Sequence, residues 1–350
     1  NTINFQTPSI IFGMDTLNQV GQEAKKLGAK KVLFVTGPNV QKNGFVEKVE
    51  SLLEKESIEV KVVMPSRNTP EPTTDIPEVL RDVAKEMGAD LVIGMGGGSV
   101  LDVAKMTAAL MNNPLTVREY FGKEKVPNKG LPTILIPSTS GTGSEVTKHA
   151  IFLDEKANVK KAVASSNILP TVAIIDPLTT ITCPQKVTAA SGFDAFLHAA
   201  EPFISKSANP LTDVIALEAI SMITKWIGPA YADGENTEAR YYMSLGSLLA
   251  GLVLNNSGTS LVHALAYPIG GEYHVPHGPS LTCLVNSCFD YIMVAKQERF
   301  VQIAKAMGEN VEGLSNREGA KLALDAINEV LLRLNLPRSL TDLNITDKSK

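Results

Sequence analysis

One carboxylate and three imidazoles stand out in this chain because they fall in two short segments. Asp194 and His198 lie four residues apart in SGFDAFLHAAEPF, and a helix places such a pair on one face. His263 lies in SLVHALAYPIGG and His277 in EYHVPHGPS, with two adjacent glycines between them where the chain can turn back. Imidazole nitrogens and a carboxylate oxygen suit a divalent transition metal, above all Zn²⁺ or Fe²⁺. A cation held by few protein ligands polarises a carbonyl or lowers the pKa of a bound hydroxyl, so the pattern predicts a catalytic metal site.

The spacing leaves a second interpretation open, because an Asp and a His four residues apart also make ordinary contacts on helix surfaces. The concentration of histidines favours the metal: the chain has five, and four of them lie between positions 198 and 277.

The first half of the chain alternates strand and helix patterns. Buried β-branched runs predict strands in ADLVIGMGG and over 31–37, 58–65, 131–138 and 171–176. Amphipathic patterns between them predict helices over 42–56, 76–88 and 101–111. KHAIFLDEKANVKKAVASS is expected to form a hairpin. Strands separated by helices of this length predict an α/β domain with a doubly wound, Rossmann-like parallel sheet.

The second half carries only helical patterns, with no convincing strand after DPLTTITCP. Helices are expected over 185–201, 210–226, 236–255, 258–267, 280–307 and 317–334. At 350 residues the chain exceeds the size at which one core usually stops growing. We therefore predict an α/β domain over 1–179 and an all-helical domain over 180–350, with Pro184 near the boundary. A cleft between two such domains is a favoured place for a small-molecule site.

Composition narrows the class of partner. The net charge of −4 argues against nucleic acid or an anionic membrane surface. No apolar run has the length of a membrane span, and NTINFQTPSIIFG lacks the form of a signal peptide. Three scattered cysteines indicate thiols in a reducing compartment, so a cytoplasmic location is expected.

Two glycine-rich turns follow predicted strands in the first half. In GMGGGS (94–99), backbone amides at a helix start would form an anion site around Gly97, Gly98 and Ser99, with Asp102 one turn further on. STSGTGSE (138–145) offers hydroxyls, and its glycines let the backbone approach a ligand. Taken singly, each is also compatible with a plain tight turn or a capped polar loop. Together, at the carboxyl ends of strands in one sheet, they favour a dinucleotide.

Six segments together resemble the iron-containing (group III) alcohol dehydrogenases, whose architecture is shared with dehydroquinate synthase. The segments appear in family order: GGGSVLDVAK, PSTSGTGSEVT, DPLTT, SGFDAFLHAAE, LAGLVLNNSGTSLVHALAYPIGG and HVPHG. The resemblance implies a nicotinamide dinucleotide on the first domain and a catalytic divalent metal, Fe²⁺ or Zn²⁺, on the helical one. It implies reversible, NAD(P)-linked conversion of a small primary alcohol to an aldehyde.

Carried over position by position, the resemblance makes Asp194, His198, His263 and His277 the metal ligands. The cofactor residues it implies are Gly97, Gly98, Ser99, Thr139, Thr142, Leu178 and Lys161. The lysine is a loose assignment because Lys160 is its neighbour, and a solvated charge is the alternative for either. We also expect a homo-oligomer, a dimer or larger.

Three departures from the family pattern matter. Relatives often carry a second histidine where this chain has Tyr267, whose high reference pKa puts a similar proton relay in doubt and leaves packing as an equal alternative. His274 could compensate, or lie in a free loop. NAD-preferring relatives often have an acid where this chain has Gly37, so NADP should be accepted and could be preferred, with Asn39 near the phosphate or in a turn. Family members usually run on beyond TDLNITDKSK, so an extension past Lys350 is expected.

Three rival interpretations remain. A polyol dehydrogenase of the glycerol type shares the two-domain plan and uses zinc. A lyase similar to dehydroquinate synthase would need a basic pocket, and no cluster of Lys and Arg surrounds the histidines. A non-catalytic binding module would hold a fully coordinated structural metal.

Overall fold

The computed structural model describes residues 2–65, 72–157 and 159–346. The chain divides into two compact units. One comprises residues 6–139 and 143–182, and the other comprises 1–5, 140–142 and 183–350. The boundary expected at 179/180 lies close to Cys183, where the main segment of the second unit begins. The expected extension past Lys350 lies outside the described residues.

The first unit is built on a six-stranded, wholly parallel sheet in the order β1-β9-β6-β4-β2-β3. Its strands are β1 (Ser9–Phe12), β2 (Lys31–Val35), β3 (Glu59–Val63), β4 (Leu91–Gly96), β6 (Thr133–Pro137) and β9 (Val172–Ile175). The central strands β4 and β6 are buried at every position, as expected for a sheet covered on both faces.

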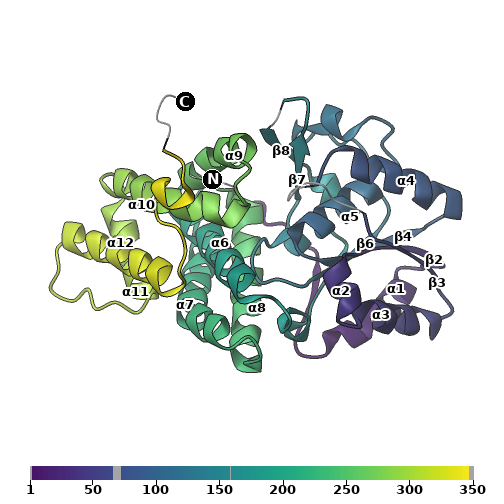
Figure 1. Cartoon of the computed structure of the whole chain (residues 1–350), viewed down its shortest axis with the longest axis horizontal. Coiled ribbons are helices and arrows are strands. Elements are labelled where there is room, and N and C mark those ends of the chain that lie inside the picture. The colour runs from purple at the N-terminus through teal and green to yellow at the C-terminus, as the bar shows by residue number, and fades with distance from the viewer. Residues whose placement is uncertain (1, 66–71, 158, 347–350) are drawn as a thin grey trace. The chain divides into compact units, whose positions relative to one another are not determined.

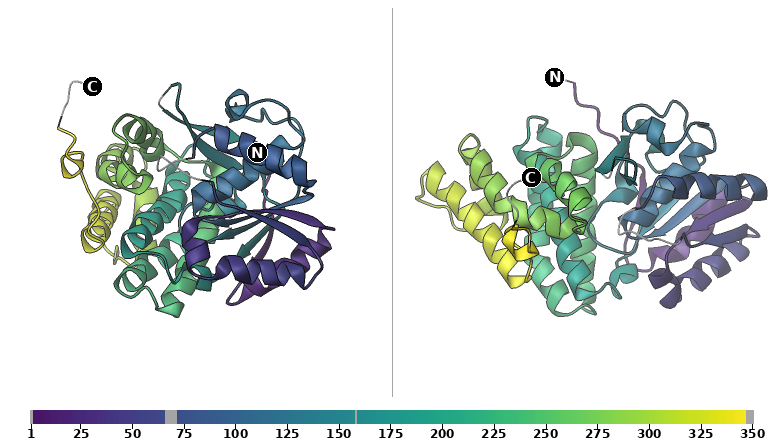
Figure 2. Two further views of the ribbon diagram at one scale, coloured as in Figure 1. Left: turned by 45° about the vertical axis from the view of Figure 1, so that its right-hand side comes forward. Right: turned by 45° about the horizontal axis from the view of Figure 1, so that its top comes forward.

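Helices cover both faces of this sheet (Figure 1, Figure 2). They are α1 (Val20–Lys26), α2 (Pro38–Lys42), α3 (Phe45–Glu54), α4 (Asp75–Met87) and α5 (Gly98–Leu110). One apolar core joins the sheet to α1 and α3, and another joins it to α4 and α5. The predicted doubly wound architecture is therefore confirmed.

A second, three-stranded sheet in the order β5-β8-β7 belongs to the same unit. It comprises β5 (Gly122–Lys123), β7 (His149–Asp154) and β8 (Val159–Ala164). β7 and β8 pair antiparallel, which confirms the predicted hairpin. Short 3-10 helices lie at Thr16–Gln19, Val117–Tyr120 (η2), Ser144–Val146 (η3), Ser166–Ile168 and Pro177–Thr180 (η5).

The second unit is helical, and its described residues contain no strand. Its helices are α6 (Gln185–Ile204), α7 (Pro210–Ala232), α8 (Thr237–Ser257), α9 (Leu261–Glu272), α10 (His277–Met293), α11 (Gln297–Ala306) and α12 (Asn316–Arg333), and a short 3-10 helix lies at Thr341–Leu343. The alanine-rich α6 and its neighbours α7 and α8 centre one apolar core. Small side chains let these helices approach closely: a methyl group at Gly192 would lie 2.8 Å from the Met243 side chain.

Several predicted boundaries were wrong. The helix predicted over 42–56 begins only at Phe45, because Gly44, whose φ of 75° lies in the left-handed region, separates it from α2. The pattern read over 280–307 is two helices, broken where Lys296 leaves the helical conformation. Strand β1 was missed because four residues carry little periodicity and pair only with the distant β9.

No single helix among the residues with described positions is both long and apolar enough to cross a membrane. Helices α8 and α9 pass that test only as a pair, and they are bent by 97° at the break between them.

Candidate metal centre and cofactor edge

Helix α6 carries the acid and one imidazole of the predicted metal site on a single face. Asp194 and His198 are one turn apart, and both side chains are buried within the helical unit. A buried acid and a buried histidine need polar partners to offset their lost hydration. The side chains that contact them therefore determine the chemistry of the site.

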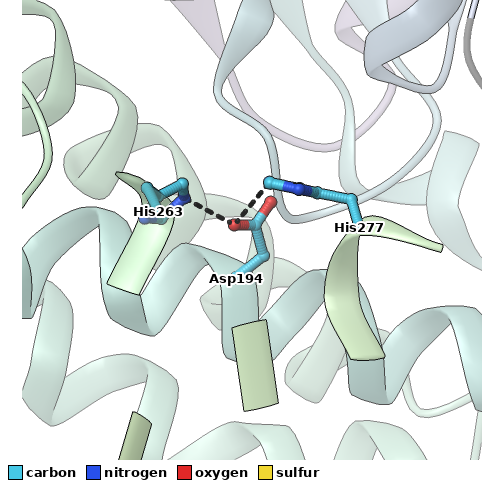
Figure 3. Close-up of side chains that lie close together, drawn as sticks. All are labelled: Asp194, His263 and His277. Carbon is cyan, nitrogen blue, oxygen red and sulfur yellow. Dashed lines mark ion pairs between the residues drawn. The ribbon is translucent and has the colours of Figure 1, made fainter. Parts of the chain in front are cut away.

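The imidazoles of His198, His263 and His277 all converge on one oxygen of Asp194. Their Nε2 atoms lie 3.3, 3.4 and 3.7 Å from Asp194 Oδ1, respectively. Figure 3 shows the carboxylate of Asp194 between His263 and His277. One ligand atom from each of these three residues lies within 4.8 Å of the others, the spacing of a potential metal group. His198 adjoins the group, with its Nε2 3.1 Å from that of His263.

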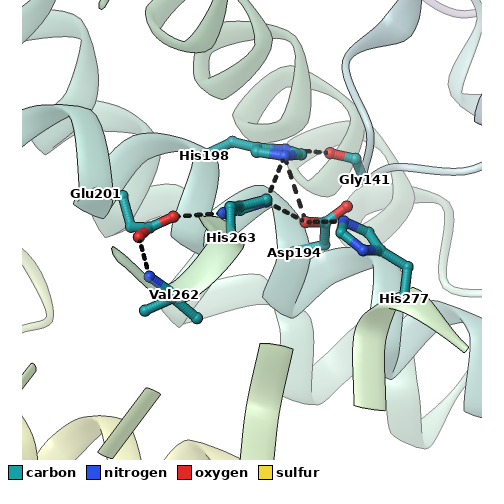
Figure 4. Close-up of polar contacts among 7 residues, drawn as sticks. All are labelled: Gly141, Asp194, His198, Glu201, Val262, His263 and His277. Atoms are coloured by element: carbon teal, nitrogen blue, oxygen red, sulfur yellow. Dashed lines mark hydrogen bonds and ion pairs between the residues drawn. The ribbon is translucent and has the colours of Figure 1, made fainter. Parts of the chain in front are cut away.

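The opposite ring nitrogens of two imidazoles face hydrogen-bond acceptors. His198 Nδ1 lies 3.2 Å from the Gly141 carbonyl oxygen, and His263 Nδ1 bonds to the Glu201 carboxylate (Figure 4). With a proton on each Nδ1, both Nε2 atoms present lone pairs toward Asp194. The ring planes of His198 and His263 stack at 25° with centroids 4.9 Å apart.

The electrostatics of the cluster favour positive charge. Burial would raise the pKa of Asp194, but the neighbouring imidazoles of His198, His263 and His277 outweigh it and hold that pKa well below its usual range. Burial lowers the pKa of His198. For His263, burial is outweighed by Asp194 and Glu201, which raise its pKa to about 9. Two carboxylates thus stabilise a positive charge, carried either by a proton or by a cation that displaces it.

These residues fit a divalent cation. Asp194 Oδ1 is buried and has no hydrogen-bond partner with good geometry, although three imidazole nitrogens face it. A buried acceptor without a partner costs free energy, and lone pairs aimed at a common point repel one another. A cation among these four atoms removes both penalties, and nitrogen with carboxylate oxygen is a donor set suited to Fe²⁺ and Zn²⁺.

His277 reaches the cluster from the first residue of α10. A methyl group at Gly278 would lie 2.7 Å from Ala190 Cβ, so this glycine permits α10 to approach α6 closely. Gly270 and Gly271, which we expected to turn the chain back, instead lie within α9. Helix α9 continues through Pro268 to Glu272, so the chain turns back only between Glu272 and Pro276.

Tyr267 lies one turn after His263 on α9, beside the cluster. Its ring is nearly parallel to that of His277, at 15°, with centroids 6.3 Å apart. The tyrosine therefore borders the predicted metal site through ring packing. His274 is exposed on the loop after α9 and lies outside the group of potential ligands among the described residues.

Most predicted cofactor residues of the first unit lie at one edge of the parallel sheet. Gly97 caps α5 directly after β4, Thr139 follows β6, and Gly37 with Asn39 follows β2. These strands are neighbours, so their carboxyl ends share an edge. Gly98 and Ser99 form the first turn of α5, and Leu178 lies in η5 after β9. Thr142 is half-buried in the short segment grouped with the helical unit.

Asp102, which was predicted to lie near the cofactor, has hydrogen-bond partners inside its own unit. It accepts hydrogen bonds from Ser144 Oγ at 2.6 Å and from the Ile151 amide at 2.9 Å. Lys105 Nζ lies 3.1 Å from the same carboxylate. Both carboxylate oxygens have partners inside the unit, so Asp102 links α5 to η3 and β7.

Lys161 is also held by a partner within its unit. Its Nζ lies 2.8 Å from Asp154 Oδ2 and 5.6 Å from the centre of the Phe121 ring. Lys160 precedes it on β8 and therefore points to the opposite face of that sheet. The cofactor contact can therefore come from only one of the two lysines, according to the face of the small sheet that meets the cofactor.

Glu201 and the Gly141 carbonyl were missed as parts of the cluster. A helical reading would have found Glu201, since it follows Asp194 by seven residues and His198 by three on the face they share. No local pattern marks Gly141, because a backbone carbonyl carries no signal of its own. A methyl group there would lie 2.5 Å from Ser191 Cβ, so the loop seats against α6 only with glycine.

Comparison with known proteins agrees with these features. The family model of the iron-containing alcohol dehydrogenases matches residues 7–177, and the model of their C-terminal domain matches residues 188–350. Long-chain-alcohol dehydrogenase 1 of Geobacillus thermodenitrificans is 38% identical, with 96% of this chain and 85% of the relative covered.

Two solved structures are similar over nearly the whole chain. A crystal structure of 1,3-propanediol oxidoreductase gives a TM-score of 0.94 at 36% identity, covering 99% of this chain and 90% of the other. Sulfoacetaldehyde reductase of Bifidobacterium kashiwanohense in complex with NAD+ gives 0.88 at 28% identity, covering 99% and 90%. The glycerol-type alternative is not favoured by these relatives.

A doubly wound dinucleotide-type sheet and a helical unit with an Asp–His cluster define a dehydrogenase that uses a nicotinamide and a metal. The chain belongs to the iron-containing alcohol dehydrogenase family. It is an oxidoreductase that acts on small alcohols and aldehydes with NAD(H).

Proposed function

We propose that this chain is a metal-dependent dehydrogenase of small primary alcohols, and an aldehyde reductase in reverse. The cation is held by Asp194, His198, His263 and His277. The observation that carries this assignment is the buried Asp194 Oδ1, which has no good hydrogen bond and is faced by three imidazole nitrogens. When bound, the cation supplies Lewis acidity toward the substrate oxygen, and the nicotinamide donates or accepts the hydride.

The protein's own residues prepare the site for this chemistry. Asp194 offsets part of the cation's charge, while neutral imidazoles leave it electrophilic. The Gly141 carbonyl and Glu201 hold protons at the far ring nitrogens of His198 and His263, so the near nitrogens remain available as ligands. Tyr267 bounds the site beside His277 and has a packing role that limits the space for substrate.

The amides at the start of α5, after Gly97, form the site for the cofactor's pyrophosphate. Their helix is 13 residues long, and its first turn lacks an acidic side chain that would repel phosphate. Ser99 supplies a hydroxyl at this turn, and Thr139 and Leu178 follow strands at the same sheet edge.

For the ribose contact, Lys161 remains the candidate over Lys160. The Lys161 side chain is 42% exposed, so its ammonium can serve a ribose hydroxyl while it stays paired with Asp154, whereas Lys160 is buried. An ammonium has three N–H donors, which allows both contacts at once.

NADP is accepted as well as NAD under this proposal. Gly37 lies two residues after β2, where an acid would repel the 2′-phosphate, and Asn39 adds a neutral polar group nearby. Iron and zinc both suit the ligand set. The proposed assembly is a homo-oligomer.

The decisive experiment replaces His263 with alanine. His263→Ala should lose the metal and NAD(P)H-dependent aldehyde reduction together, because it removes a ligand from the centre of the cluster. Metal content is measured after loading with Fe²⁺ or Zn²⁺, and turnover is followed by absorbance of the reduced cofactor. His274→Asn is the matched control for metal content, since His274 is exposed and outside the cluster. Full activity in a metal-free His263→Ala protein would contradict the proposal.

A further inference from the structure

Glu201 is a fully buried acid beside the predicted metal site, and no step of the chemistry above uses it as a ligand. Its side chain has no exposed surface. It lies on α6, on the same face as Asp194 and His198 but further from the point where the imidazoles meet (Figure 4). A fully buried carboxylate needs specific partners to offset its lost hydration.

Both oxygens of Glu201 are occupied by groups at the start of α9. Oε1 accepts a hydrogen bond from the Val262 amide at 2.7 Å, and Oε2 accepts one from His263 Nδ1. Val262 is the second residue of α9, where backbone amides have no partner within the helix and a negative charge is favourable. One carboxylate therefore caps this helix and orients the imidazole that the helix carries.

We infer that Glu201 is a positioning residue that sets the tautomer of His263, and with it the metal affinity of the cluster. The inference rests on the proposed metal site. A carboxylate accepts hydrogen bonds at both oxygens, so it requires a proton on His263 Nδ1 and leaves Nε2 with its lone pair toward Asp194. A carboxylate behind a ligating histidine also raises the basicity of the ligand nitrogen.

An amide in the same place cannot do this. In Glu201→Gln only one side-chain oxygen remains to accept, and the Val262 amide and His263 Nδ1–H both need an acceptor. If the oxygen serves Val262, the amide NH₂ donates to Nδ1 and shifts the ring proton to Nε2, where it blocks metal binding. If the oxygen serves His263, two donors face each other at the start of α9.

The test measures Zn²⁺ affinity by competition with a chromophoric chelator, together with the visible absorption spectrum of the Co²⁺-loaded protein. Glu201→Gln should weaken Zn²⁺ binding about 10- to 100-fold and alter the Co²⁺ spectrum. Glu201→Asp keeps the carboxylate on a shorter side chain. Its Zn²⁺ affinity should lie between those of Glu201→Gln and the unsubstituted protein. Glu218→Gln makes the same chemical change at an exposed position of α7 and should bind as the unsubstituted protein does.

A purely structural cap would give a different result. Glu201→Gln would then lower the thermal midpoint of the metal-free protein but leave the Zn²⁺ affinity and Co²⁺ spectrum unchanged, and this outcome overturns the inference. If Glu201→Gln does not fold, Glu201→Asp decides: affinity equal to that of the unsubstituted protein overturns the inference, and several-fold weaker binding supports it. If the unsubstituted protein binds neither Zn²⁺ nor Co²⁺, the proposed metal site itself fails.

Discussion

At the scale of single residues, the cluster works through groups that hold its histidines rather than through the histidines alone. His198 is fixed by a backbone carbonyl and His263 by a carboxylate, so two nitrogens of the proposed ligand set face Asp194 without a cation. Ordering ligands in advance reduces the conformational entropy lost on binding. Backbone position is therefore as important to the site as ligand identity.

Gly141→Ala tests that statement about the backbone. The added methyl group would lie 2.5 Å from Ser191 Cβ and 2.8 Å from the Ser191 carbonyl oxygen, so the loop must shift away from α6. We expect a loss of about 2 kcal/mol in the free energy of unfolding. Metal affinity should fall as well, because the carbonyl that orients His198 moves.

Gly228→Ala is the control for this substitution, since a methyl group there meets nothing within 4 Å. Chemical denaturation and chelator competition measure the two effects. A Gly141→Ala protein with unchanged metal affinity would show that the carbonyl does not hold the imidazole.

At the scale of elements, α5 depends on a lysine buried in its interior face. The Lys105 side chain has no exposed surface, and burial lowers its pKa. Its ammonium bonds to Asp102 and to the carbonyl oxygens of Ser144, Thr147 and His149. Helix α5, which begins at the turn proposed to bind the cofactor, is thereby tied to η3 and β7.

Lys105→Met should cost about 3 kcal/mol in unfolding free energy, because it leaves the Asp102 charge buried without its cation. The double variant Asp102→Asn/Lys105→Met should recover part of the loss. Lys85→Met, at an exposed position of α4, is the control and should change stability by no more than about 0.5 kcal/mol. Denaturation followed by circular dichroism measures all three; a loss in the single variant no larger than in the control would contradict the role of the buried pair.

Asp154 makes the stability of the three-stranded sheet depend on pH in the acidic range. Hydrogen bonds from Lys161 and Arg118 lower its pKa from 3.8 to about 2, and the Nζ and Nε atoms lie 2.8 and 2.9 Å from its oxygens. A carboxyl group whose pKa is lower in the folded state than in the unfolded state stabilises the fold at any pH above its unfolded-state pKa. That contribution is lost as the pH falls from about 4 to about 2.

Asp154→Asn should therefore lower the free energy of unfolding by about 1 kcal/mol at neutral pH. The variant should also lose less stability than the unsubstituted protein as the pH falls from about 4 to about 2. Glu155→Gln, at the exposed neighbouring position, serves as the control. Thermal midpoints across this pH range measure the effect. An Asp154→Asn protein with the same acid profile as the unsubstituted chain would contradict it.

At the scale of the molecule, the only tryptophan reports on the helical unit by itself. Trp226 lies on α7 and stacks on Tyr242 of α8, with ring centroids 4.7 Å apart. Its fluorescence therefore follows the unfolding of the unit that contains the Asp–His cluster.

Removing the cation should lower the midpoint of that fluorescence transition by about 10 °C if the metal is present at about a thousand times its Kd. The midpoint falls because the cation binds the folded state and not the unfolded state, so its removal takes away that stabilisation. Adding Zn²⁺ back should restore the midpoint, whereas Mg²⁺ should not, because it prefers oxygen ligands. Equal midpoints with and without chelator would argue against a metal in this unit.

The alternation of strands and helices, the parallel sheet and the helical second half follow from apolar periodicity, so they could be predicted from the chain alone. Local patterns were insufficient where an element depends on a distant partner. β1 is four residues long and pairs with β9 from the other end of its unit. The break between α10 and α11 was missed because the apolar pattern continues across it.

The sequence by itself determined the residue types of the proposed metal site and the face of α6 that presents Asp194 and His198, since a helical repeat places residues four apart together. Only the tertiary structure decided that His263 and His277 meet them, and that Glu201 and the Gly141 carbonyl hold the rings behind. It also placed Asp102 and Lys161 against partners inside their own unit. The physical reason is that such contacts are fixed by packing between helices and loops far apart in the chain, which the local spacing of residues does not encode.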